Sequence, residues 1–321
     1  MLRPTMVQHD MRYWRIRPDA RLTKWVHCYF VVEDIGPGAG PTADTNPDAE
    51  LLLPDGHSEI VFSFGAGFER WAVGTSDRPA VMRPSYLIGG RSHSVLTRNL
   101  GRLSLAGVKL DSRTLRALIG TPLAEFRDAT VTLRDLNDRS LLELEEALAL
   151  TRHAAGVAQL LDQFFLRALS GIQPAAAATD ALLQKIRRER GMLSIMDWMR
   201  DQRVDSRTVE RQFCDWTGMT PKRYARVIRF KHTYHRLLSA ADCRGAMAAH
   251  LDGYYDQSHF HREFRFFTGA APGAMRNGSM HAGTSVTDHL IAGEFENPRP
   301  QPAIRRSAAY TRAAAGSVRL R

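Results

Sequence analysis

Hydrophobic residues recur with two different periods along the chain, and the change falls near residue 110. Before it, apolar and polar residues alternate in short runs, as at Ile60, Phe62 and Phe64, and Gly, Pro, Asn or Asp separates the runs. Alternation of this kind is typical of strands with one buried face. Many short strands at this spacing predict a small barrel or sandwich. The expected strands are 25–32, 50–53, 58–64, 68–75, 85–90, 94–98 and 103–110.

From Asp111 onwards, apolar residues recur every three or four positions, which predicts amphipathic helices. Three such segments, 112–119, 137–150 and 157–169, close an N-terminal domain of residues 1–171. A Pro and a run of Ala over 172–179 then predict a linker. The chain is therefore expected to be α+β, with a β-rich N-terminal domain, closing helices and an all-α C-terminal domain.

Residues 180–276 contain helical patterns throughout. Asp and Ser residues precede several of these segments and Gly residues end them, as N-caps and C-caps do. In the last segment Phe260, Phe264 and Phe267 form an apolar stripe, which leaves the other faces polar. The expected helices are 180–190, 195–202, 206–217, 221–239, one after Asp242 and one from Asp256 to Gly269.

Two pairs of these helices meet at short turns, one at Arg203-Val204 and one at Gly253. A short polar helix that follows such a turn is the helix-turn-helix pattern, whose second helix enters the DNA major groove. The connecting helix has 19 residues from Pro221 to Ser239, or about 28 Å. Adjacent major-groove faces lie about 34 Å apart, so one chain could read two grooves.

The second motif resembles that of the AraC family of bacterial transcription regulators. It contains Gly253, Asp256, Ser258, His259, Phe260, Arg262 and Phe264, followed by Gly269 and Pro272. The first motif resembles the same family at Arg211, Phe213, Gly218, Pro221 and Tyr224. Three positions depart from the family pattern. Arg203 stands where Gly is frequent, Met199 where a small residue is usual, and Asp252 where a small or apolar residue is usual.

This resemblance implies a bacterial transcription regulator, and the scattered cysteines together with the lack of a long apolar run predict a cytoplasmic location. Its partners would be double-stranded promoter or operator DNA, RNA polymerase, a small-molecule effector and a second copy of the chain. Most of residues 18–150 resemble the N-terminal domain of one branch of AraC-like regulators, through Pro54-Asp55-Gly56, Glu59, Gly74 and Gly120-x-Pro122. The sequence leaves the effector, the operator, the oligomeric state and the choice between activation and repression open.

Charge distribution agrees with a DNA-binding C-terminal half. The net charge is +10, and residues 180–276 hold 18 Lys and Arg against 11 Asp and Glu, whereas residues 1–179 hold 20 of each. Basic charge gathered in one helical domain suits the phosphate backbone, although a solvated basic face or an anionic membrane surface would look similar. No run of about 20 apolar residues is present. Residues 277–321 are rich in Gly, Ser, Ala, Pro and Arg and are expected to be a disordered basic tail.

The side chains expected to read bases lie near the N-terminal turns of the two recognition helices. Arg can bind guanine, Gln can pair with adenine, and Glu can accept from cytosine. Some of these side chains could instead bind phosphate or pair with each other. The candidates are Arg207, Glu210 and Arg211 in the first helix, and Gln257, Ser258, His261 and Arg262 in the second.

The main alternatives are a cupin-like metal-dependent enzyme and a DNA-binding protein without a regulatory role. Only His57, Glu59 and His93 are candidate metal ligands, without cupin spacing, and no catalytic or cofactor motif is found. Cys28, Cys214 and Cys243 have neither disulfide nor zinc spacing. No catalytic residue, metal or cofactor is therefore predicted. In the N-terminal domain Trp25, Tyr29, Phe62 and Trp71 could line a ligand site or pack as core.

Overall fold

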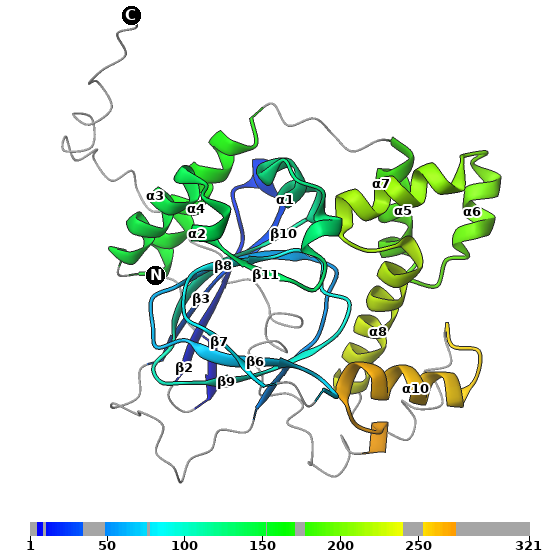
Figure 1. The fold of residues 1–321 in the computed structure, drawn as a ribbon, viewed down its shortest axis with the longest axis horizontal. Helices are drawn as coiled ribbons and strands as arrows, with labels where there is room; N and C mark the ends of the chain where they lie inside the picture. The colour runs from blue at the N-terminus through cyan, green and yellow to red at the C-terminus, as the bar shows by residue number, and fades with distance from the viewer. Residues whose placement is uncertain are drawn as a thin grey trace, which may run out of the picture.

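The computed structural model describes residues 5–8, 11–34, 49–75, 78–151, 153–170, 177–239 and 253–273. The N-terminal part contains two antiparallel sheets that face each other (Figure 1). The seven-stranded sheet has the order β1 (Thr5–Gln8), β2 (Met11–Ile16), β3 (Val26–Asp34), β10 (Ser104–Leu110), β5 (Ser58–Ser63), β8 (Tyr86–Ile88) and β11 (Thr130–Thr132). The four-stranded sheet has the order β4 (Glu50–Leu52), β9 (Val95–Asn99), β6 (Phe68–Ala72) and β7 (Ala80–Met82).

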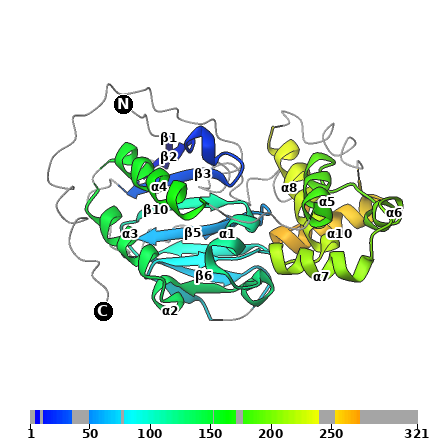
Figure 2. The same cartoon turned by 90° about the horizontal axis from the view of Figure 1, so that it is seen from above.

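Successive residues of the long strands serve two different cores. On β3, Tyr29 and Val31 pack toward the helices, while Phe30 and Val32 pack into the space between the sheets. This is the period of two that a pleated strand imposes. Helices cover the outer face of the seven-stranded sheet (Figures 1 and 2). The helical elements of this domain are η1 (Ala20–Leu22), α1 (Ser112–Ile119), η2 (Leu123–Phe126), α2 (Leu133–Leu136), α3 (Arg139–Ala149) and α4 (Ala154–Ala168).

The C-terminal part is helical and has its own core. Phe213, Tyr224, Phe230, Phe264 and Phe267 are fully buried there. Phe230 stacks on Phe267 with ring centroids 4.4 Å apart, so the last helix lies against the long connecting helix. The described helices are α5 (Ala177–Arg188), α6 (Ile195–Asp201), α7 (Ser206–Thr217), α8 (Pro221–Ser239) and α10 (Gln257–Thr268).

Sequence patterns place most elements within a few residues of their observed bounds, with four strands missed. Strands β1, β2, β7 and β11 were not expected. Helix α5 begins at Ala177, so three residues of the expected linker are helical, and the buried Thr179 hydroxyl bonds Gln212 of α7. The expected helix after Asp242 falls within 240–252, which lies outside the described residues, as does the expected tail 277–321. Among described helices, none is long and apolar enough to cross a membrane.

The two domains share a contact surface instead of being joined only through a linker. Leu53 follows β4 in the N-terminal domain, yet it is 2% exposed and belongs to the core of the C-terminal helices. Gly56, two residues before β5, accepts a hydrogen bond from Tyr224 Oη through its carbonyl oxygen at 3.2 Å. The turn at 54–56 therefore packs directly on helix α8.

Candidate nucleic-acid interface

Helix α7 is the second helix of the first motif, and local signals define both of its ends. The Asp205 carboxylate caps it by accepting from the backbone N–H of Thr208 at 2.8 Å. Gly218 ends it with φ of 74°, a left-handed conformation that favours glycine. The turn before it contains Arg203 with φ of 53°. Glycine is frequent at this position in the AraC pattern, and the backbone here is left-handed although the residue is Arg.

Helix α10 is built in the same way in the second motif. The Asp256 carboxylate accepts from the backbone N–H of His259 at 2.6 Å, and Gly269 ends the helix with φ of 75°. Thr268 donates to the carbonyl oxygen of Phe264 at 2.8 Å, as Thr217 does to that of Phe213 at 2.7 Å. The two helices are therefore repeats of one structural unit.

The predicted reading residues occupy the free side of these two helices. Arg207, Glu210 and Arg211 are exposed on α7, and Gln257, Ser258 and Arg262 are exposed on α10. His261 differs, because it is half-buried beside the Phe260 ring and its Nε2 has no hydrogen-bond partner within the described parts of the chain. The structure thus leaves six of the seven candidates open to a partner and places His261 at the edge of the packed face.

Glu263 holds α10 onto α8 from the opposite side of the helix. It is 4% exposed, and its Oε1 accepts from Arg226 Nε at 2.7 Å and from Arg229 Nη2 at 3.1 Å. Arg226 also lies over the Phe266 ring, 4.0 Å from its centroid. Two charge-assisted bonds to one buried carboxylate fix the orientation of a helix closely. Sequence reasoning missed this anchor, because Glu in an exposed-looking helix carries no signal of burial.

Basic side chains are also exposed on the helices of the two motifs. Lys222, Arg223 and Arg265 are exposed on α8 and α10, in addition to the arginines among the candidates. Tyr255, directly before the Asp256 cap, is 93% exposed, which makes it the most exposed large apolar side chain among the described residues. Exposed Arg and Lys suit phosphate groups, and exposed Arg and Gln suit base edges.

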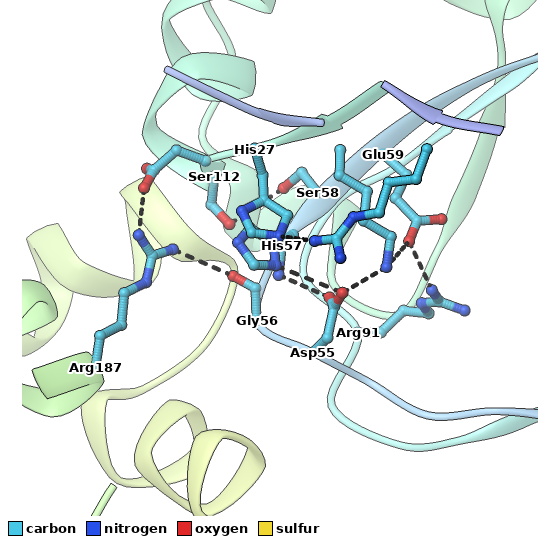
Figure 3. Close-up of polar contacts among 12 residues, drawn as sticks. His27, Asp55, Gly56, His57, Ser58, Glu59, Arg91, Ser112 and Arg187 are labelled. Carbon is cyan, nitrogen blue, oxygen red and sulfur yellow. Dashed lines mark hydrogen bonds and ion pairs between the residues drawn. The ribbon is translucent and has the colours of Figure 1, made fainter. Parts of the chain in front are cut away.

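The three candidate metal ligands of the N-terminal domain do not come together. The His57 ring stacks on His27 with centroids 4.4 Å apart, and its Nδ1 lies 3.5 Å from the Asp55 carboxylate. Glu59 pairs instead with Arg91 and Lys109, and His93 pairs with Asp128. Within the described residues no group of three or more potential ligands could hold a metal ion. Figure 3 shows the buried cluster around Asp55, His57 and Glu59.

The aromatic residues considered for a ligand site belong to different parts of the N-terminal domain. Tyr29 and Phe62 are fully buried in the core beneath the helices, and Trp25 packs against that core. Tyr29 Oη donates to Asp162 of α4 at 2.8 Å. Trp71 belongs to the other sheet, where Arg98 lies over its ring. Tyr29, Phe62 and Trp25 therefore belong to the helix-covered core, whereas Trp71 lies outside it.

Two family models match separate parts of the chain. A family model described as a helix-turn-helix domain matches residues 198–278, and a domain of unknown function (DUF6597) matches residues 14–132. A comparison with curated proteins gives no significant match. Among solved structures, an apo form of ToxT from Vibrio cholerae strain SCE256 is 11% identical with a TM-score of 0.41, covering 83% of this chain and 95% of that chain. ToxT from Vibrio cholerae O395 is 9% identical with a TM-score of 0.41, covering 85% and 98%.

Proposed function

We propose that the chain is a DNA-binding regulator of the AraC type, since a helix-turn-helix family model matches residues 198–278, and that its two recognition helices, α7 and α10, read adjacent major grooves of one DNA site. The supporting observation is that equivalent turns of two equivalent helices present exposed polar side chains. Arg207, Glu210 and Arg211 do so on α7, and Gln257, Ser258 and Arg262 on α10. The long helix α8 connects the two motifs.

The proposed contacts divide into base-reading and phosphate-binding groups. Arg211 and Arg262 stand six residues after the capping Asp in their helices, and both are exposed. Bidentate Arg contacts to guanine suit this position near the groove. Lys222 and Arg223, in the first turn of α8, suit the phosphate backbone instead. His261 is a weaker candidate, since it is only partly exposed and lies beside the Phe260 ring.

We also propose that the N-terminal domain regulates DNA binding by sensing a small molecule or by pairing with a second copy of the chain. The support is architectural, because a separate β-rich domain packs directly on the DNA-binding helices through Leu53 and Gly56. A ligand that binds the folded chain raises its melting temperature. By reciprocity, an effector also changes DNA affinity. If compounds raise the melting temperature but leave the DNA affinity unchanged, sensing is not supported. Pairing with a second copy of the chain is then the remaining role of this domain.

Selection from random duplex DNA tests the DNA-reading proposal. The purified full chain should enrich a site with two determinants about one helical turn apart. Its affinity should fall steeply with salt through counterion release. A chain that is folded by circular dichroism but enriches no sequence, or whose binding does not depend on salt, contradicts the proposal.

A further inference from the structure

The first recognition helix ends against the N-terminal domain. The carbonyl oxygen of Gly218, which ends α7, accepts from Arg127 Nε at 2.8 Å. Gly90, just after β8, lies so close to this helix end that a Cβ atom on it would overlap the carbonyl oxygen of Thr217. The Arg116 guanidinium of α1 also lies over the Trp216 ring, 5.6 Å from its centroid. Backbone therefore approaches backbone at this point, which requires glycine.

The second recognition helix ends against the same domain at a different place. A Cβ atom on Gly269, which ends α10, would lie 2.9 Å from Cγ1 of Val73. Val73 directly follows β6 in the four-stranded sheet, whereas Gly90 follows β8 in the seven-stranded sheet. Figure 1 shows the end of α10 beside β6 and the end of α7 beside the segment that follows α1. Both equivalent helix ends thus rest on one domain.

A third contact fixes the scaffold helices that carry the two motifs. The Arg187 guanidinium of α5 donates to Asp111 Oδ2 at 2.5 Å, to Tyr224 Oη at 2.7 Å and to the Gly56 carbonyl oxygen at 3.5 Å. Asp111 caps α1, and Arg113 of α1 pairs with Asp180 of α5. Figure 3 shows Arg187 reaching from the C-terminal helices to Gly56. One guanidinium therefore joins α5, α8 and the N-terminal domain.

We propose that the N-terminal domain sets the spacing and orientation of the two recognition helices. It thereby determines the spacing of the two half-contacts, which are the DNA segments that α7 and α10 each contact. The inference rests on the proposed function. The reading side chains lie in the N-terminal turns, and the docked Gly218 and Gly269 lie at the opposite ends. DNA and the N-terminal domain can therefore be bound together. Each helix has 12 residues, about 18 Å, so a small shift at the docked end moves the reading end.

A matched pair of glycine variants tests this role in the full chain. Gly90→Ala places a methyl group against Thr217 and Met219 of the C-terminal domain, and no atom of the N-terminal domain lies among its nearest neighbours. Gly273→Ala is the control, because a Cβ atom there meets nothing within 4 Å. Affinity is measured on a selected duplex with both half-contacts and on the same duplex with one half-contact scrambled. Linking two binding modules in the right geometry gains about 10²–10⁴ in affinity.

The measured ratio is the affinity for the duplex with both half-contacts divided by the affinity for the duplex with one. The proposal expects Gly90→Ala to lower this ratio by about tenfold or more, with little change in the affinity for the one-contact duplex. Gly273→Ala should keep the wild-type ratio. Arg127→Ala, which removes the bond to Gly218, should lower the ratio in the same direction and serves if Gly90→Ala does not fold. An unchanged ratio in folded variants overturns the inference, and a raised affinity does so as well, because docking would then inhibit binding. Failure of the wild-type chain to bind DNA overturns the proposed function itself.

Discussion

Asp205 and Asp256 hold the same position in the two helix-turn-helix motifs, each accepting the backbone N–H three residues further along the chain. Because the caps are equivalent, every later residue of α7 has a counterpart on α10. Arg211 corresponds to Arg262, and Gly218 corresponds to Gly269. The chain therefore presents one recognition unit twice.

This correspondence predicts paired effects of Arg211→Ala and Arg262→Ala. Each should cost about 1–3 kcal/mol of binding free energy on the preferred site and relax base preference at one position. The two relaxed positions should lie about one helical turn apart in the DNA. Arg139→Ala is the control, since it removes the same charge from an exposed side chain of the N-terminal domain. A loss that is uniform over all sequences would mark Arg211 or Arg262 as a phosphate contact instead.

The buried Glu263 carboxylate predicts a large stability effect. Glu263→Ala leaves Arg226 and Arg229 without their shared partner, and removal of one side of a buried ion pair costs about 3 kcal/mol of unfolding free energy. Glu263→Gln keeps the shape and one acceptor, so the loss should be smaller. Denaturant unfolding measures both, with Arg265→Ala on the exposed face of α10 as the control. Equal stability of wild type and Glu263→Ala would contradict the anchoring role.

Arg203 predicts a gain in stability on substitution by glycine. Its φ of 53° is left-handed, a conformation that costs a residue with a Cβ about 1–2 kcal/mol. Glycine removes this conformational cost, but it also makes the unfolded chain more flexible, which offsets part of the benefit. Arg203→Gly should therefore raise the unfolding free energy by about 0.5–1 kcal/mol. Arg200→Gly, within α6, should instead destabilise by about 1 kcal/mol. Thermal unfolding of the two variants gives opposite signs if the turn has the described geometry.

Asp128 predicts a pH-dependent contribution to the stability of the N-terminal domain. Burial raises its pKa, but hydrogen bonds from His93 and Ser92 outweigh burial and lower the pKa to about 2. The pKa of Asp128 in the folded protein lies below its unfolded value of about 3.9. The ionised carboxylate therefore contributes fully to the unfolding free energy above about pH 3.9, and this contribution is lost as the pH falls toward 2. The difference in unfolding free energy between wild type and Asp128→Asn should therefore be larger at pH 7 than at pH 3. A difference independent of pH would contradict the ion pair.

Local signals in the sequence predicted the parts of the fold that depend on neighbouring residues. Asp205, Asp256, Gly218 and Gly269 mark helix ends through hydrogen bonds and backbone angles within a few positions. On α10 the apolar stripe of Phe260, Phe264 and Phe267 indicated which faces would be exposed, and on α7 the candidates were chosen from their place near the N-terminal turns. Strand β2 was missed because polar Arg15 points into the interior and contacts His27 Nε2 at 3.0 Å, which breaks the expected alternation.

Contacts between distant positions could not be predicted in this way. Nothing near Gly90 in the sequence indicates that Thr217 will lie against it, and Glu263 carries no local sign of its two arginine partners. These relationships form only when separate elements pack together. They define the docking of the two domains, so the sequence indicated the parts of the chain but not how they are joined.

Leu53 has a consequence for any attempt to exchange domains between this chain and another helix-turn-helix protein. A chimaera that joins helices α5 to α10 to a foreign sensor would lack Leu53, leaving a gap in a core that contains Tyr224 and Phe213. It would also lack the Gly56 carbonyl group that Arg187 and Tyr224 contact. The two halves of this chain are therefore not interchangeable modules, and a working graft must carry the 53–56 turn with the DNA-binding helices.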